Sequence, residues 1–459
     1  MTAVQSAQAL YPRTVTPPAE PLSLPRLVLS FIKNPLLALP QQAYEEALVA
    51  QESANRVIYW ISAPELIEEL LLRHAERLMQ SPVQKRIFRR ALKDGILSAD
   101  GDLWRWQRRT MAPVFRPAEI LTYVPDMTAP ADELLQQWRA DKPGSLQDID
   151  EGMTGVTFTV IMQTMLGGIT EEAGVIRKAT EQSLRHVTWE MLYGSFRLPE
   201  WLPHPASWTL ERAAKRMRGA VRSIIERRMR EENSEAADDL LARLMAARDP
   251  ETGEPMSMER LINNLLTLLE AGHETTSRAL SWTLYLLARA PEWQDAVRDE
   301  VRSVVGDQPI EGRHIGQLTV TQQVLKEVMR LYPPVPVMSR VATQTFRAGG
   351  VDFPEGCVIL FPIYCIHRHR QLWDDPARFD PSRFSPERDT YPRTQYMPFG
   401  AGSRICLGAS FAMTEATAIL ATLIRGAAFE WDGIVDPEPV SRVTLQAKGG
   451  IALKVTPLA

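Results

Sequence analysis

The sequence predicts a mainly α-helical fold with a minor β portion, arranged as one domain. Helical patterns dominate from about residue 117 to residue 300, and short β-type runs between proline-rich turns follow residue 333. A length of 459 residues would by itself suggest about three domains. However, no internal repeat and no linker divides the chain after residue 25, and the candidate chemical residues are expected to converge on one site.

The first half of the chain contains segments whose local structure follows from residue types. Residues 1–25 are rich in proline, serine and threonine, which predicts an extended arm ahead of a single domain at 26–459. The β-branched and aromatic run at 56–61 predicts a strand, and an amphipathic helix is expected at 64–71. Residues 198–205 hold three prolines, which predicts a loop between two helices.

The longest helical pattern extends from residue 257 to residue 289, which is about 50 Å at 1.5 Å per residue. Ser257 is placed to cap its N-terminus, and Pro291 ends it. Its middle reads AGHETT at 271–276, where a glycine and two threonines are unfavourable for a helix. Such a local conflict often marks a functional site.

Two interpretations of this segment are open from the residues alone. Glu274 and Thr275 form an acid–alcohol pair that could relay protons, and a threonine hydroxyl can bend a helix by bonding back to it. Gly272 would offer a flat surface to a planar cofactor. The other interpretation is a surface glutamate in a kinked structural helix.

A second helical segment carries Glu327 and Arg330, which are three residues apart and can pair on one face. By itself such a pair is usually a solvated surface ion pair. Two neighbouring features distinguish this pair from a chance surface pair. The helix ends abruptly at Pro333, and Arg383 follows in a short PSRF run.

The most informative segment is the glycine-rich loop at 399–409, FGAGSRICLGA, which carries Cys406 and precedes a helical pattern at 410–424. Backbone N–H groups at the start of a helix stabilise a thiolate, and small residues allow a flat cofactor to approach. These residue types suit the presentation of a thiolate to a metal. A buried cysteine in an ordinary turn would not need Phe399 and Arg404 at these spacings.

Composition limits the other function classes. The chain is 45% hydrophobic and 24% charged, and its net charge of −4 gives no indication of nucleic acid binding. Three cysteines predict no disulfide framework and fit a reducing compartment, so a cytoplasmic location is expected. The apolar stretch at 24–39 is interrupted by prolines and charges, so neither a membrane span nor a signal peptide is predicted.

Together with a helix that reads WRWQRR at 104–109, these motifs occur in the order found in the cytochrome P-450 family, the haem-thiolate monooxygenases. The chain resembles this family from about residue 48 to its end. The resemblance implies one triangular, mostly helical domain with small sheets. Because no N-terminal anchor helix is expected, the chain looks like a soluble, bacterial-type member.

The resemblance also implies roles for individual residues. Haem b would be the cofactor, Cys406 the ligand of its iron, and Glu274 and Thr275 the catalytic proton relay. A buried triad would position the cysteine loop, namely Glu327, Arg330 and Arg383. The haem would be bound by Trp104, Arg108, Ala271, Gly272, Arg340, Phe399, Arg404 and Gly408.

The implied reaction inserts one atom of dioxygen into a lipophilic substrate such as a fatty acid, terpenoid or steroid, while the other atom leaves as water. Electrons from NAD(P)H would arrive through separate proteins, a ferredoxin and its reductase. Arg105 and Arg109 are either a solvated helix face or part of a docking patch for an acidic redox partner.

Residue types do not identify the substrate. Two alternative functions also stay open: a peroxide-driven peroxygenase, which would dispense with the relay, and a non-catalytic haem-thiolate sensor, which would need a signalling partner domain. The pocket candidates are all apolar, namely Phe88, Leu97, Leu184, Val187, Leu266, Val335, Val337, Met338 and Leu445.

Overall fold

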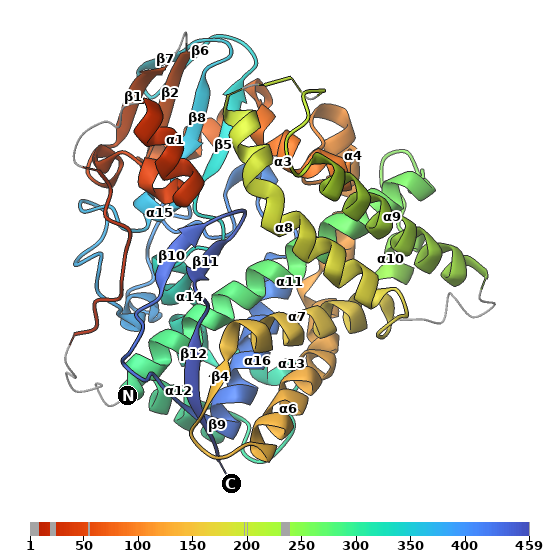
Figure 1. Cartoon of the computed structure of the whole chain (residues 1–459), viewed down its shortest axis with the longest axis vertical. Coiled ribbons are helices and arrows are strands. Elements are labelled where there is room, and N and C mark those ends of the chain that lie inside the picture. The colour runs from red at the N-terminus through yellow and green to blue at the C-terminus, as the bar shows by residue number, and fades with distance from the viewer. Residues whose placement is uncertain are drawn as a thin grey trace.

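The computed structural model describes residues 9–18, 24–53, 56–196, 198–199, 201–230 and 239–458. The predicted fold class is confirmed: the described chain is mainly helical with small sheets (Figure 1). The helices are α1 (Leu24–Lys33), α2 (Pro64–Glu68), α3 (Pro82–Leu92), α4 (Gly101–Met111), α5 (Pro117–Ile120), α6 (Val124–Ala140), α7 (Ile149–Leu166), α8 (Ala173–Ser195), α9 (Ser207–Arg230), α10 (Leu240–Ala246), α11 (Met258–Arg289), α12 (Pro291–Val304), α13 (Gly312–Ile315), α14 (Thr319–Leu331), α15 (Ile363–Ile366) and α16 (Ala409–Gly426).

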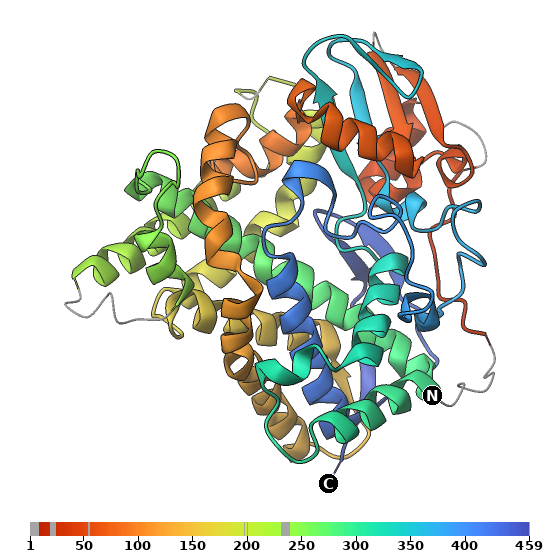
Figure 2. The same ribbon diagram turned by 180° about the vertical axis from the view of Figure 1, so that it is seen from behind.

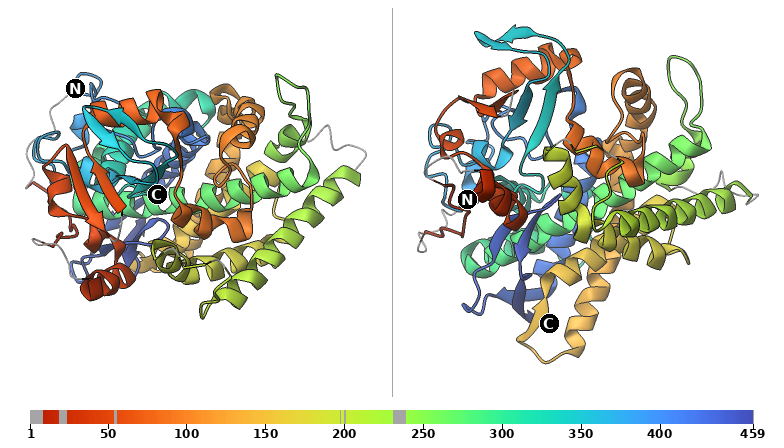
Figure 3. Two further views of the ribbon diagram at one scale, coloured as in Figure 1. Left: turned by 90° about the horizontal axis from the view of Figure 1, so that it is seen from above. Right: turned by 45° about the horizontal axis from the view of Figure 1, so that its top comes forward.

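Within the described residues the strands form four small sheets. The five-stranded sheet has the order β1-β2-β8-β5-β3, with β2 and β8 parallel. It lies at one end of the molecule, and α9 and α10 lie at the other (Figure 3). The strands are β1 (Leu48–Ser53), β2 (Arg56–Ile61), β3 (Leu78–Gln80), β4 (Ser145–Asp148), β5 (Met338–Ala342), β6 (Phe346–Ala348), β7 (Val351–Phe353), β8 (Val358–Phe361), β9 (Ala427–Glu430), β10 (Glu438–Ser441), β11 (Leu445–Lys448) and β12 (Ala452–Pro457).

Helix α11 crosses the centre of the molecule and packs against α7, α9, α14 and α16. Its Ser257 hydroxyl accepts a hydrogen bond from the Arg260 N–H, as expected for an N-cap. Because neighbours cover it on several sides, apolar residues are buried around much of its circumference. The view from behind shows α16 running beside α11 from the cysteine loop (Figure 2). These two helices bring the AGHETT segment and Cys406 to one region.

The described part of the predicted arm is packed against the body of the protein. Residues 9–18 form no helix or strand. The Leu10 carbonyl accepts a hydrogen bond from the Phe379 N–H at 2.9 Å, and the Arg13 carbonyl accepts one from the Tyr332 hydroxyl at 2.8 Å. The Val15 N–H donates to the Tyr364 hydroxyl at 3.2 Å. Residues 1–8 and 19–23 lie outside the described residues.

Several predicted elements match the structure closely, and one needs correction. The strand at 56–61 is β2, and the long helix is α11. The helix expected at 64–71 is shorter, because α2 ends at Glu68 and the chain continues as one wider π-helical turn, Glu69–Arg73. This turn changes the direction in which the following side chains point.

Candidate functional site

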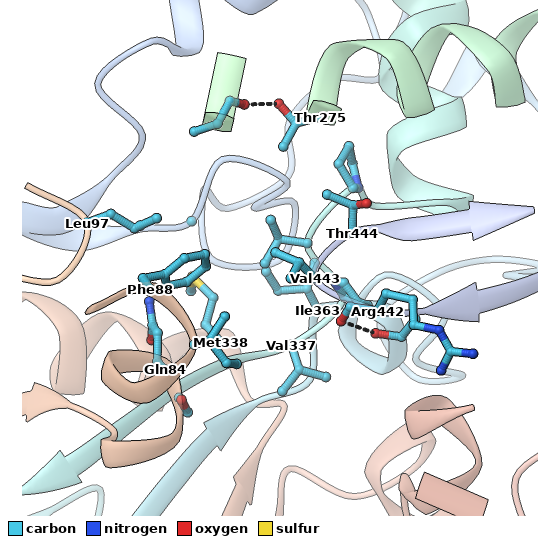
Figure 4. A pocket seen from close by; sticks show the side chains of 18 of the residues that line it. Gln84, Phe88, Leu97, Thr275, Val337, Met338, Ile363, Arg442, Val443 and Thr444 are labelled. Atoms are coloured by element: carbon cyan, nitrogen blue, oxygen red, sulfur yellow. Dashed lines mark hydrogen bonds between the residues drawn. The ribbon is translucent and has the colours of Figure 1, made fainter. Parts of the chain in front are cut away.

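A large cavity lies between α3, α8, α11, the cysteine loop and the turn that joins β10 to β11. Its volume is about 1280 Å³, above the roughly 300–1,000 Å³ typical of a site for one small molecule. Figure 4 shows Phe88, Leu97, Thr275 and Val443 around one shared space. Most of the predicted pocket residues line this cavity, but Leu266 and Leu445 do not, because both are fully buried in the protein core.

The cysteine loop is held in a tight backbone conformation. The Cys406 N–H donates to the Phe399 carbonyl at 2.9 Å, and the Ile405 N–H donates to the Gly402 carbonyl at 3.1 Å. Gly402 has a φ of 73°, and a side chain there would collide with the backbone carbonyl of Leu71. Glycine is therefore required at this position by both conformation and packing.

The Cys406 side chain is accessible, and it lines the cavity together with Phe399 and Gly408. The protein around the cavity separates this thiol from bulk water, and the desolvation raises the pKa of Cys406, whereas the Gly408 N–H and the Arg108 charge lower it. The expected stabilisation of the thiolate by loop N–H groups is therefore present but is outweighed by desolvation. A cation bound to the sulfur would reverse this balance.

Four donor side chains surround the same end of the cavity, namely Trp104, Arg108, Arg340 and Arg404. The Arg404 guanidinium lies 4.4 Å from the centre of the Trp104 ring and pairs with Asp100 at 2.6 Å. Among the described residues, no carboxylate lies within ion-pair distance of Arg108 or Arg340. Burial lowers the pKa of Arg340 to about 10, and the nearby Arg404 adds to this shift. The site thus has more buried positive charge than its own carboxylates neutralise.

The other arginines of α4 do not form a free basic patch. Arg105 pairs with Asp102 at 2.5 Å. Arg109 binds Asp249 through two hydrogen bonds of 2.7 and 2.9 Å. The docking patch, which was one of the two interpretations of these residues, is therefore not supported, because both charges are already paired within the chain.

The AGHETT segment of α11 lines the cavity through Ala271, Gly272, Glu274 and Thr275. The Thr275 hydroxyl donates to the Ala271 carbonyl at 2.8 Å, which leaves its lone pairs free to accept a hydrogen bond in the cavity (Figure 4). A Cβ at Gly272 would lie 2.8 Å from the Ile161 side chain of α7. A side chain at this position would thus displace the end of the Ile161 side chain, and the backbone of Gly272 also lines the cavity.

Glu274 is buried and fixed by three donors on two elements. It accepts hydrogen bonds from Arg278 at 3.0 Å, from Thr444 at 3.1 Å and from Gln446 at 3.1 Å. Burial raises its pKa, but the Arg278 charge and the hydrogen bonds outweigh burial, so the pKa lies below its usual value. Glu274 is therefore a carboxylate at neutral pH, and it is not a surface residue.

Glu327, Arg330 and Arg383 come together in the interior. Arg330 binds both oxygens of Glu327 at 2.7 and 2.8 Å, and Arg383 Nε lies 3.6 Å from Glu327 Oε1. All three side chains are at most 2% exposed. The remaining Arg330 N–H groups donate to the carbonyls of His367, Pro376 and Arg378. These hydrogen bonds from Arg330 hold in place the irregular segment that precedes the cysteine loop.

Glu415 on α16 is a buried acid that the sequence analysis did not single out. It is 1% exposed, and neither carboxylate oxygen has a hydrogen-bond partner among the described residues. Burial raises its pKa to about 8, with an opposing contribution from Thr276 of α11. The signal available in the sequence was its position as the only acid in a helix made mainly of apolar residues and threonines.

Replacing Glu415 with glutamine should make folding stability less dependent on pH. The folded protein keeps a proton that the unfolded chain releases above its ordinary pKa of 4.5. The stability contributed by the protonated group is complete below that value and is lost as pH rises through about 8, by up to about 5 kcal/mol. Denaturant unfolding from pH 5 to 8.5 should show a steeper decline for wild type than for Glu415→Gln.

Glu415→Asp is the matched control for this measurement. It keeps an ionisable carboxyl at the same position, so its stability should still fall with rising pH. Parallel curves for wild type and Glu415→Gln would contradict the assignment of a protonated Glu415.

Comparison with known proteins now identifies the family. The model of the family described as Cytochrome P450 matches residues 41–455. The chain belongs to the cytochrome P450 family. A cytokinin hydroxylase of Arabidopsis thaliana is 30% identical over 89% of this chain and 82% of its own length. Cyclooctatin synthase of Streptomyces melanosporofaciens is 30% identical over 92% of this chain and 91% of its own length.

Membership of this family defines the cofactor and the reaction class. A cytochrome P450 is a haem-thiolate monooxygenase that uses haem b and receives electrons from NAD(P)H through redox partners. The site fits this group, because the cavity exceeds the size of a single-ligand site and the unpaired Arg108 and Arg340 match the two acidic side chains of haem. Among the helices of the described residues, none combines the length and apolar character needed to cross a membrane.

Proposed function

We propose that this P450 hydroxylates a lipophilic organic substrate of the fatty acid, terpenoid or steroid kind, and that Cys406 is the only protein ligand of its haem iron. The observation that carries the proposal is the meeting of an accessible thiol, unpaired arginines and the AGHETT helix at one cavity. Bound there, the haem would supply oxygen activation under the influence of the thiolate. Trp104, Arg108, Arg340 and Arg404 would bind its carboxylates, and Ala271, Gly272, Phe399 and Gly408 would lie against its ring.

Glu274 and Thr275 are proposed to control protons in different ways. Thr275 Oγ1 holds a water or substrate oxygen by accepting a hydrogen bond, since its own proton is given to the Ala271 carbonyl. Glu274, ionised and held by Arg278 and Thr444, takes a proton only when these contacts loosen. The triad of Glu327, Arg330 and Arg383 is proposed to retain the haem by positioning the cysteine loop, without taking part in the chemistry.

Replacing Thr275 with alanine should uncouple electron consumption from product formation. The variant should still bind haem and substrate and oxidise NAD(P)H through a redox partner system, but hydrogen peroxide should replace much of the product. Proton-transfer assistance is commonly worth about 10²–10⁴-fold in rate, so the ratio of product to NAD(P)H oxidised should fall clearly. That ratio is the measurement.

Thr283→Ala is the control, because Thr283 lies on the same helix and bonds back to the Ala279 carbonyl at 2.6 Å but does not line the cavity. It should leave the ratio unchanged. If Thr275→Ala also leaves the ratio unchanged while added peroxide supports full turnover, the peroxygenase alternative would replace the proposed relay.

We further propose a separate ferredoxin and its reductase as the electron donors, a soluble, bacterial type, a cytoplasmic location, and one functional domain at 26–459 behind the arm at 1–25. The Streptomyces relative and the absence of any disulfide among three cysteines support these choices. The plant relatives match at equal identity and do not favour the bacterial type. Reconstitution with a ferredoxin system and with a flavoprotein reductase would distinguish the donors.

A further inference from the structure

Three carboxyl groups line the cavity within the described residues: Glu190, Glu270 and Glu274. Two of them are neutralised by arginines. Glu190 binds Arg86 at 2.9 Å and Arg90 at 2.8 Å, and Glu274 binds Arg278 at 3.0 Å. Glu270 has no ion-pair partner among the described residues. Within the described part of the chain, the cavity therefore contains one carboxyl whose charge no side chain balances.

The surroundings of Glu270 make a carboxyl group at this position unfavourable for the stability of the protein. Among the described residues its Oε1 atom is buried and has no hydrogen-bond partner, while the residue as a whole is partly accessible where it lines the cavity. Burial raises its pKa to about 7, and no charged group opposes this effect. The cavity wall supplied by α7 and α8 is mainly apolar, with Ile161, Met165, Leu184 and Val187. An unpaired carboxyl that is largely removed from water is unfavourable unless a ligand in the cavity pairs with it.

The position of Glu270 places it close to the proposed chemistry. It directly precedes Ala271, whose carbonyl accepts the Thr275 hydroxyl, on the helix that forms one wall of the cavity. A ligand group bound by Glu270 would therefore hold the neighbouring part of the ligand beside the AGHETT segment. Recognition at this point would select both the compound and the region of it that is presented for reaction.

Apart from the arginines assigned to the haem carboxylates, namely Arg108, Arg340 and Arg404, the cationic side chains that line the cavity do not offer a site for a substrate acid. Arg90 is already bound to Glu190. Arg442 donates to the Ile32 carbonyl of α1, and its side chain points away from the space shared by Thr275, Phe88 and Leu97 (Figure 4). A fatty acid carboxylate near Glu270 would meet a like charge or a desolvated acid.

We propose that Glu270 binds a positively charged nitrogen of the substrate, so that this enzyme acts on lipophilic amines in preference to fatty acids. This inference rests on the proposed function; it disfavours the fatty acids named there and narrows the lipophilic substrates of the same site to those that carry an amine. The ammonium group would balance Glu270 as Arg278 balances Glu274. The rest of the substrate would pack against the apolar wall.

The test compares three probes with the same ten-carbon chain on the holoenzyme: decyltrimethylammonium, decan-1-ol and decanoate. The quaternary nitrogen has no lone pair, so it cannot bind iron. Binding is measured by isothermal titration calorimetry and by the shift of the haem absorption band. Wild type should bind the ammonium probe more tightly than decanoate. Glu270→Gln should lower the affinity for the ammonium probe about tenfold or more, because the loss of a contact with a charged group commonly lowers affinity by about this factor.

The same variant should change decan-1-ol binding by less than about threefold, since the amide keeps the size and hydrogen-bonding capacity of the side chain. Glu181→Gln is the matched control, because it makes the same change of charge on the exposed face of α8, outside the cavity. It should leave all three affinities unchanged. Unchanged ammonium binding in Glu270→Gln, or an equal loss for all three probes, would overturn the proposal.

The design separates this inference from the proposed function. The reduced carbon monoxide spectrum of each protein reports the haem-thiolate site independently of any substrate. If wild type lacks the red-shifted band, the proposed function fails, while the calorimetric comparison still decides the role of Glu270. If the band is present and the ammonium preference is absent, only the inference about Glu270 fails.

Discussion

Cys406→Ser should abolish the red-shifted absorption band that a reduced cytochrome P450 shows with carbon monoxide. A serine hydroxyl holds its proton far more tightly than a thiol and is a poor replacement for a soft thiolate donor. Because Cys406 is the cysteine that faces the cavity, no other thiol of the described chain can substitute for it. The measurement is the difference spectrum between the reduced protein with and without carbon monoxide.

Cys357→Ser is the control for this prediction. Cys357 is buried in the sheet region, and burial raises the pKa of its thiol to about 11, so it remains protonated. Its replacement should leave the band in place, even if stability falls. A Cys406→Ser protein that keeps the band would show that another residue is the ligand.

Glu327→Ala should give protein that contains little haem. The change leaves Arg330 and Arg383 as buried cations without their carboxylate, and breaking such a pair costs about 3–5 kcal/mol. It also removes the acceptor for the Asp380 N–H, which Glu327 Oε1 binds at 2.8 Å. The ratio of haem absorption to protein absorption, together with thermal unfolding, measures the effect.

The control is Glu181→Ala, which removes a glutamate from an exposed pair with Arg177 on α8. Exposed pairs contribute about 0–1 kcal/mol, so this variant should retain normal haem content. Glu327→Gln provides a second variant, since it keeps the side-chain volume and an acceptor oxygen, and its haem content should lie between those of wild type and Glu327→Ala. Normal haem content in Glu327→Ala would show that the triad does not retain the cofactor.

The sequence predicted those features that depend on neighbouring residues. Helix α11 follows from its cap at Ser257, its apolar pattern and the proline at 291. Strand β2 follows from a β-branched and aromatic run. The cysteine loop was recognisable because several small residues and one thiol occur at fixed spacing within 399–409. In each case the interactions that determine the structure join residues close together in the sequence, so residue types alone were enough to predict it.

The features that the sequence did not predict depend on contacts between distant segments. Glu274 is fixed by Thr444 and Gln446, which the β10–β11 hairpin brings to it from about 170 residues away. A Cβ at Gly272 would meet the side chain of Ile161 on another helix. The charge of Arg109 is paired with Asp249, and this pairing argues against the docking patch that was one interpretation of the residue. For Glu270 and Glu415, single acids in apolar helical runs were the available signals.

The packed segment at 9–18 has a practical consequence for protein engineering. It bonds to Tyr332, directly after the helix that carries Glu327 and Arg330, and to Phe379, directly before Asp380 of the same network. An N-terminal truncation that removes residues 9–18 would therefore delete hydrogen bonds to the regions that hold the triad. A purification tag or a fused reductase joined ahead of residue 9 keeps these hydrogen bonds, whereas the truncation would put cofactor retention at risk.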